Sequence, residues 1–520
     1  MKNNQNPKTN HGVPITNYQE LAVIAKESTI SFSGNILGRG MGLIITLLLA
    51  RLFGATLFGI YSLGQVIFNF SATIACFGLS YGAIRFVSTN LAKKDQARVK
   101  GALFEVSVIP LVLGTFIALI LYLGAEKIAL LYGKPELFRP LRLFAFGVPF
   151  FSLFQALSSA TRGFKTTKYT VLGEKIITPF LNICLIILFY YFGLKIFGMI
   201  GAYIMSIIFG ALFFLSSLKK LFPKIVMGEL KPKFRTRKIL KTSIPLTLSS
   251  TLFFLVAWTD IFMVGYFLPT VEVGVYRLTT LLSSQVIVFL LAINAIFTPF
   301  ISEYHQGKKI KELESLYKVV TRWAFYFASL VFLIIAIAPR ELLQVFGENY
   351  ILGKNSMITL AAGHLISAGV GSVGFILIMT GYQNWELINS LILFILTLAT
   401  NIILIPRFGI IGAAIATAFS IGLINIVRLI EVYKTLKIQP FNLKYFEGIL
   451  AGVVTFLLVS GLKNYLFTNF HYLVSLMLSL LFVLTTFSLL LLIFGLEKED
   501  RVILNKIKHK LWQGKFWSLV

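Results

Sequence analysis

Several ionisable residues of this sequence lie inside long apolar stretches, where a charge is energetically costly and therefore suggests a function or a charged partner. Arg39 lies near the middle of the first stretch, with Asn35 four residues before it on the same helical face. No acidic residue lies within one helical turn of Arg39. Because a guanidinium forms bidentate contacts with phosphate, Arg39 is a candidate for binding an anionic group in a cavity; the alternative is an ion pair with a neighbouring helix.

Three other arginines lie nearer to the ends of such stretches and are further candidates for contact with a substrate. Arg51 lies where a long cationic side chain can instead extend to the membrane interface. Arg85 could meet an anionic headgroup, or it could be an ordinary positive charge flanking a span. Arg277 could mirror Arg51 in a later stretch, or likewise extend to the interface.

One lysine and two acids complete the set of candidates. Glu174 and Lys175 are adjacent, and adjacent helical residues point to different faces, so we expect that they do not pair and that Lys175 assists Arg39. Asp260 follows Trp258 in another apolar stretch. It either forms a salt bridge to a neighbouring helix or titrates during transport; a coupling ion, H+ or Na+, would act through Asp260 or Glu174.

The elements that must position these residues are membrane-spanning helices. Of the 520 residues, 57% are hydrophobic and 13% charged, against about 25% charged in a soluble domain. The apolar residues form long runs without strand alternation, so we predict an all-α integral membrane protein with about fourteen spans. The predicted spans are 28–53, 57–80, 101–124, 140–162, 168–192, 196–218, 242–266, 273–300, 320–338, 355–381, 385–405, 409–433, 445–462 and 471–494.

The net charge of +27 is carried mainly by the loops. Loops after even-numbered spans are rich in Lys and Arg, at 93–100, 162–168, 219–241, 308–318 and 434–444, except the loop at 381–386, which has none; loops after odd-numbered spans are short and poor in them. By the positive-inside rule, both termini are expected in the cytoplasm and the number of spans is even. This placement favours a protein of the cytoplasmic membrane, in contact with the bilayer, over a nucleic-acid-binding protein.

The chain also contains an internal repeat. Gly59-Ile60-Tyr61 and Gly274-Val275-Tyr276 lie 215 residues apart, as do Lys93-Lys94 and Lys308-Lys309. Two parallel six-helix lobes are therefore expected, with a substrate path between them. The predicted divisions are a cytosolic segment 1–27, an N-lobe 28–218, a basic linker 219–241, a C-lobe 242–433, two further spans with their preceding loop at 434–494, and an amphipathic basic tail 495–520.

The sequence contains no recognisable catalytic or cofactor motif. It has no P-loop, no His-Glu-x-x-His and no cluster of acids for a metal, and the two cysteines, Cys76 and Cys184, lie singly in apolar runs. We therefore expect no catalytic residue, no metal and no cofactor, and a transporter in place of an enzyme.

Three stretches resemble the polysaccharide transporters of the multidrug/oligosaccharidyl-lipid/polysaccharide exporter superfamily, which include the Wzx-type O-antigen flippases. They are ARLFG at 50–54 with FGIYSL at 58–63, TDIFMVG at 259–265 with VGVY at 273–276, and GIIGA at 409–413. The first-span pattern of the related lipid II flippases falls on Gly38, Arg39, Gly42 and Ile45, so its second arginine is absent. Their second-span acid and arginine fall on Ile60 and Thr73, which argues against lipid II as substrate.

The resemblance implies a monomeric flippase that moves an isoprenoid pyrophosphate-linked oligosaccharide between leaflets by alternating access. Two alternatives stay open: a cation-coupled drug or metabolite exporter similar to the MATE branch, and a membrane polysaccharide polymerase or glycosyltransferase. The latter would need a sizeable outer loop, and the longest outer segment here, Ala125 to Arg139, is short.

Overall fold

The computed structural model describes residues 18–225, 230–467 and 470–495, and within these ranges every regular element is helical. The first half contains α1 (Tyr18–Ala75), α2 (Leu79–Ala92), α3 (Gln96–Leu131), η1 (Pro135–Leu137), α4 (Phe138–Arg162), α5 (Lys168–Thr170), the π-helical η2 (Val171–Ile177), α6 (Thr178–Tyr191), α7 (Lys195–Leu221) and η3 (Pro223–Ile225).

The second half continues with α8 (Thr236–Phe267), α9 (Thr270–Ser283), η4 (Ser284–Ile287), α10 (Val288–Gln306), α11 (Ile310–Ile337), α12 (Pro339–Gln344), η5 (Glu348–Gly353), α13 (Lys354–Val370), α14 (Val373–Met379) and α15 (Gln383–Leu436). It ends with α16 (Leu443–Leu462), the π-helical η6 (Lys463–Phe467) and α17 (Tyr472–Ile493). The segment predicted at 1–27 lies mostly, and the basic tail almost entirely, outside the described residues.

Eleven of the described helices are long and apolar enough to cross a membrane, and a bent pair, Glu348–Val370 with Val373–Met379, is a twelfth when its two helices are counted as one span. Two of the eleven change direction at a glycine. The backbone is non-helical at Gly54 (φ 76°) and Gly409 (φ 60°), a left-handed region that glycine enters without steric cost. Counting each of these two helices twice gives fourteen spans, and both breaks fall between spans predicted as separate.

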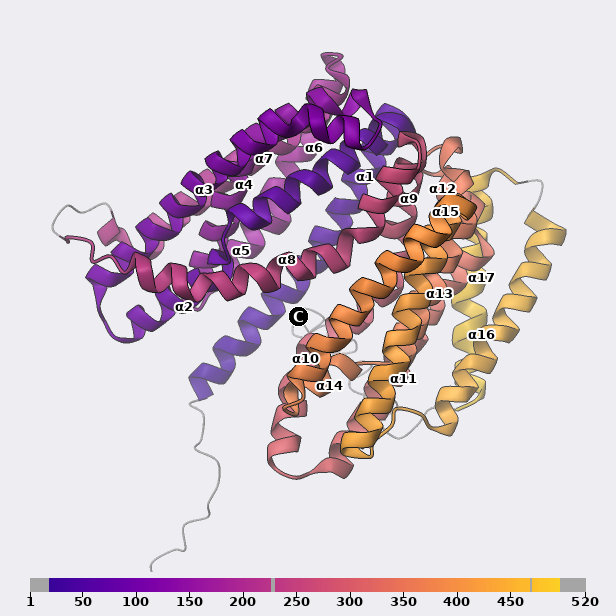
Figure 1. Ribbon diagram of the computed structural model, residues 1–520. Coiled ribbons are helices and arrows are strands. Elements are labelled where there is room, and N and C mark those ends of the chain that lie inside the picture. Colours follow the sequence, from indigo (N-terminus) through magenta and orange to yellow (C-terminus); the bar gives the residue numbers. More distant parts are fainter. Residues whose placement is uncertain (1–17, 226–229, 468–469, 496–520) are drawn as a thin grey trace, which may run out of the picture.

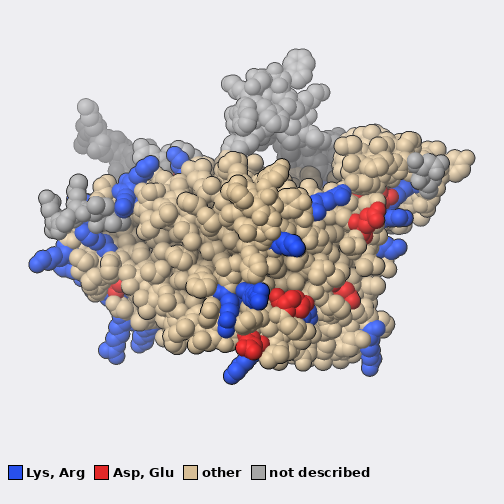
Figure 2. All heavy atoms as spheres, turned by 90° about the horizontal axis from the view of Figure 1, so that it is seen from above, with Lys and Arg blue, Asp and Glu red and all other residues tan. Residues whose placement is uncertain are grey.

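Many large apolar side chains on the spans are exposed, among them Leu123, Phe253 and Leu457. In Figure 2, away from the undescribed residues, Lys, Arg, Asp and Glu form small groups on a broad uncharged background. A helix satisfies its own backbone hydrogen bonds, so such a surface can face lipid. The predicted fold class, an all-α multi-pass membrane protein, is confirmed.

The spans form two groups, visible in Figure 1 as a purple bundle and an orange bundle. In the first lobe, α4 packs against α3 and α7; in the second, α13 packs against α11 and α15. The last two spans, α16 and α17, attach to the second lobe through an apolar cluster that includes Leu333, Ala451 and Phe487. The six-plus-six-plus-two arrangement expected from the repeat is therefore present.

The two lobes meet where the repeat motifs touch each other. A Cβ added at Gly59 would overlap the carbonyl oxygen of Thr270, and one added at Gly274 would overlap that of Ala55. Ala55 and Thr270 are themselves 215 residues apart, so each contact is the repeat image of the other. A pseudo-two-fold axis thus passes between the two glycines, and only residues without side chains allow the backbones to approach so closely.

Candidate functional site

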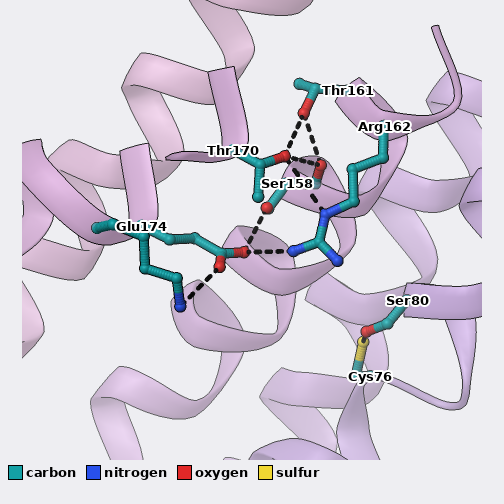
Figure 3. Close-up of polar contacts among 8 residues, drawn as sticks. Cys76, Ser80, Ser158, Thr161, Arg162, Thr170 and Glu174 are labelled. Carbon is teal, nitrogen blue, oxygen red and sulfur yellow. Dashed lines mark hydrogen bonds and ion pairs between the residues drawn. The ribbon is translucent and has the colours of Figure 1, made fainter. Parts of the chain in front are cut away.

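Glu174 is the centre of a polar cluster inside the first lobe. It lies in the π-helical turn η2, and its Oε1 accepts hydrogen bonds from the Ser158 hydroxyl at 2.5 Å and from Arg162 at 3.3 Å (Figure 3). The Lys175 Nζ lies 3.6 Å from the other carboxylate oxygen. The expectation that Glu174 and Lys175 do not pair is therefore wrong. A π-helical turn has more residues than an α-helical turn, so the angle between successive side chains around the helix axis is smaller. The long, flexible lysine side chain spans the remaining distance to the carboxylate.

Arg39 lies on α1 beside this cluster. The preceding residue, Gly38, faces Lys175, because a Cβ added there would lie 2.9 Å from the lysine Cδ. Arg39 itself is exposed, and it forms no hydrogen bond or ion pair with any residue that the structure describes. Gly40 and Gly42 have no atoms within 4 Å of an added Cβ, so the helix borders open space here. The acid Glu174 thus lies near three cations: Arg162 and Lys175, which contact it, and Arg39, which has no partner among the described residues.

A second cluster contains Asp260 and Arg277 and lies between the lobes. Asp260 accepts hydrogen bonds from the Tyr276 hydroxyl at 3.1 Å and from the Ile261 backbone N–H at 2.8 Å. The Arg277 guanidinium lies over the Trp258 ring, 4.6 Å from its centroid, in a cation–π contact. Asp260 and Arg277 interact electrostatically, but no ion pair within bonding distance joins them among the described residues.

The first lobe contributes tyrosines to the same cluster. Arg277 lies near Tyr61 and Tyr203. These two rings pack edge to face at 6.4 Å, and Gln65 donates a hydrogen bond to the Tyr61 hydroxyl at 3.2 Å. Tyr61 and Tyr276 are repeat partners, 215 residues apart. The cluster therefore brings together the equivalent motifs of the two lobes, around Tyr61 and Tyr276, with Arg277 of the second lobe near both.

Arg51 lies at the end of the bundle where α1 turns at Gly54, here called the distal end, and donates hydrogen bonds from its Nε and Nη2. Its Nε donates to the Val345 carbonyl at 2.6 Å, and its Nη2 donates to the Gln344 carbonyl and the Tyr472 hydroxyl, both at 3.0 Å. Arg51 thereby caps the end of α12 and connects the first lobe to the second and to α17.

Lys134 forms a second connection at the distal end. It follows α3 and donates to the carbonyl of Gly265, near the end of α8. Burial lowers the pKa of Lys134, and the neighbouring Glu136 partly opposes that shift. Tyr132 packs edge to face on Tyr266 at 6.2 Å. The lobes are therefore held together at this end by polar, aromatic and backbone contacts.

Arg85 lies on α2, outside these two clusters. It is exposed and lines a small cavity together with residues that lead into α8. The structure thus places Arg39 and Lys175 on adjoining elements, Asp260 and Arg277 in one cluster, and Arg51 and Arg85 at separate places.

Several charged residues that are buried or that form ion pairs between elements were not identified from the sequence. Arg322 on α11 is fully buried. Arg428 and Glu386 form a two-pronged ion pair between the two halves of α15. Lys463 pairs with Glu341 at 2.8 Å and ties α16 to the second lobe. Each lies near a span end in the sequence, where a charge is unremarkable, so no pattern distinguished it.

The described residues contain no group of three or more His, Cys, Asp or Glu side chains that could hold a metal ion. Both clusters contain cations, hydroxyls and aromatic rings, which are groups that can contact an anion or a sugar.

Residues 24–305, more than half of the chain, match the family model described as polysaccharide biosynthesis protein. The chain is 24% identical over 423 residues to an uncharacterized membrane protein of Methanocaldococcus jannaschii, covering 76% of this chain and 81% of that protein. It is 25% identical over 207 residues to a probable low-salt glycan biosynthesis flippase of Haloferax volcanii, covering 39% of this chain and 44% of that protein.

Two solved structures share the fold. Lipid II flippase MurJ in an inward closed conformation has a TM-score of 0.68 at 16% identity, covering 89% of this chain and 98% of that one. An inward-facing multidrug resistance MATE family transporter of the MOP superfamily has a TM-score of 0.64 at 17% identity, covering 76% and 94%. At such identities the likeness shows the fold alone.

Together, the two-lobed helical bundle and the charged clusters within it define a multi-pass membrane protein with the fold of the MOP-superfamily transporters. The chain belongs to the family of polysaccharide biosynthesis proteins. The resemblance to the polysaccharide transporters of that superfamily, noted from the sequence motifs, is confirmed.

Proposed function

We propose that this protein is a flippase that moves an isoprenoid pyrophosphate-linked oligosaccharide, a polysaccharide repeat unit, across the cytoplasmic membrane. The observation that carries the proposal is the unpaired Arg39, exposed in mid-span beside the Lys175, Arg162 and Glu174 cluster. A cation at this depth is costly without an anion, and a pyrophosphate supplies one. The family match to polysaccharide biosynthesis supports an anionic, sugar-bearing lipid.

The transport step we propose is alternating access by a monomer. The ends of the spans with basic loops face the cytoplasm, together with both termini, by the positive-inside rule. Because the lobes are closed at the distal end, this conformation would receive its substrate from the cytoplasmic side. Arg39 and Lys175 would hold the pyrophosphate, with Arg277 contacting it between the lobes. Separation of the distal contacts around Gly59 and Gly274 would then release the head outside.

Asp260 and Glu174 are the acids through which H+ or Na+ would couple to this movement. Asp260 supports this role better, because its contacts in the described structure are a tyrosine hydroxyl and a backbone N–H and it has no ion-pair partner there. The same observation favours the second candidate function, a cation-coupled drug or metabolite exporter, which the MATE-like fold also fits. In neither case does the protein perform covalent chemistry.

The test is the substitution Arg39→Ala in cells that depend on this gene. Surface polysaccharide, measured by labelling intact cells, should fall by about a hundredfold, whereas the amount of protein in the membrane fraction stays unchanged. Lys309→Ala, which removes an exposed cation from a loop, is the matched control and should export normally.

Normal polysaccharide export by the Arg39→Ala variant would contradict the proposal. Deletion of the gene separates the two candidate functions. Loss of surface glycan supports the flippase, whereas unchanged glycan with new sensitivity to cationic dyes would support the exporter.

A further inference from the structure

A small cavity of about 140 Å³ lies where α2 ends, α3 begins and the chain enters α8. Six cationic side chains line it: Arg85, Lys93, Arg98, Lys233, Arg235 and Lys238. A water molecule takes about 30 Å³ of liquid volume, and pockets for drug-sized ligands measure about 300 Å³ or more. The cavity therefore has room for a phosphate group, but not for a sugar chain.

The acids around this cavity leave most of its positive charge without compensation. Glu105 is buried, and its Oε1 accepts hydrogen bonds from the Arg235 backbone N–H at 3.1 Å and from the Thr236 hydroxyl at 2.6 Å, so it caps the start of α8. Asp95 pairs with Arg98 at 3.0 Å. Within the described ranges, no acid forms an ion pair with the other five cations.

An aromatic pair adjoins the cavity. Phe104, next to Glu105 on α3, and Phe234, between Lys233 and Arg235, pack together with ring centroids 5.7 Å apart. Both rings are about half exposed, at 56% and 52%. Exposed aromatic rings at the ends of spans are typical of the layer between headgroups and acyl chains. A cavity beside such a pair therefore lies at the level of lipid headgroups.

We propose that this cavity binds the phosphate of an anionic phospholipid, with Phe104 and Phe234 against the glycerol and upper acyl region. Basic pockets between spans bind acidic headgroups in this way. The backbone N–H of Lys233 donates to the Ala97 carbonyl at 3.0 Å, so the segment before α8 is docked on α3. The bound lipid thus bridges the first lobe and the entry to the second. This site does not depend on the flippase proposal.

The experiment uses the purified full-length chain, titrated with phosphatidylglycerol or phosphatidylcholine of identical acyl chains and followed by native mass spectrometry. Wild-type protein should bind phosphatidylglycerol at least about tenfold more tightly. The triple variant Lys93→Gln, Lys233→Gln, Lys238→Gln should lose that preference.

The matched control removes three exposed lysines from the loop that the repeat relates to Lys93: Lys308→Gln, Lys309→Gln, Lys311→Gln. It should retain the preference. Phe234→Ala, which keeps every charge, should also weaken phosphatidylglycerol binding. If the triple variant does not fold, this single variant tests the proposal in its place.

Three results would overturn the proposal. Equal affinity of wild-type protein for the two lipids would mean that no headgroup site exists. Equal loss in the triple variant and the control would indicate a general charge effect. Displacement of phosphatidylglycerol by millimolar inorganic phosphate, with Phe234→Ala behaving as wild type, would identify free phosphate and not a lipid as the ligand.

Discussion

The distal end and the interior of the first lobe use opposite means to bring helices together. At the distal end, Gly59 and Gly274 allow backbone to approach backbone, and Arg51 donates three hydrogen bonds to other elements. Around Glu174 the contacts are between long, partly exposed side chains, and Arg39 nearby has no partner among the described residues. Close backbone packing allows one separation only, whereas solvated ion pairs can exchange partners.

This difference indicates a division of roles. The distal contacts keep the two lobes in register, so a change there should alter the conformation of the whole molecule. The cluster around Glu174 can release its cations to an incoming anion at low cost, so a change there should alter binding more than stability. Three substitutions test the comparison, in order of decreasing effect on stability.

Gly59→Leu should have the largest effect. The new side chain overlaps the carbonyl of Thr270, a backbone atom that cannot move aside, so the lobes must separate or the protein unfolds. We expect a loss of more than about 3 kcal/mol in the free energy of unfolding, or a change of conformation that exposes the distal end. Thermal unfolding of purified protein and labelling, from outside, of a cysteine introduced at the distal end would measure these two results.

Gly124→Leu is the control for this prediction, because a Cβ at Gly124 meets no atom within 4 Å. If the Gly59→Leu and Gly124→Leu variants had similar stability and labelling, the close contact at Gly59 would not be what holds the two lobes together.

Arg51→Gln should have an intermediate effect. It removes the charge from hydrogen bonds to Val345, Gln344 and Tyr472, which connect the first lobe to α12 and α17. A loss of about 1–3 kcal/mol in the free energy of unfolding is expected, because charge-assisted hydrogen bonds are replaced by weaker ones. Chemical denaturation in detergent would measure it. Arg340→Gln, an exposed arginine on α12 itself, should leave stability unchanged; an equal loss there would point to net charge as the cause.

Glu174→Gln should have the smallest effect on stability, less than about 1 kcal/mol, because its ion pairs with Arg162 and Lys175 are partly exposed to solvent. The Ser158 hydrogen bond can form to the amide oxygen instead. If the cluster serves binding, the variant should hold inorganic pyrophosphate more tightly, as calorimetry on purified protein would detect. A loss of stability as large as that of Gly59→Leu would remove the contrast between the two regions.

Much of this architecture is predictable from the chain alone. The apolar runs predict the spans because a helix in lipid satisfies its backbone hydrogen bonds by itself, whatever its neighbours. The loop charges and the 215-residue repeat predict two lobes and two further spans. The same reasoning identified Asp260, Arg277, Arg39 and Lys175 one by one as residues that need an explanation.

Which of these residues meet was decided by the tertiary structure. The rotation and tilt of each helix determine its contacts, and neither can be read from an apolar run that looks alike on all faces. The π-helical turn therefore paired Glu174 with Lys175 against expectation, and the inter-lobe packing placed Arg277 beside Tyr61. The number of spans follows from local hydrophobicity, whereas the site follows from contacts between helices far apart in the chain.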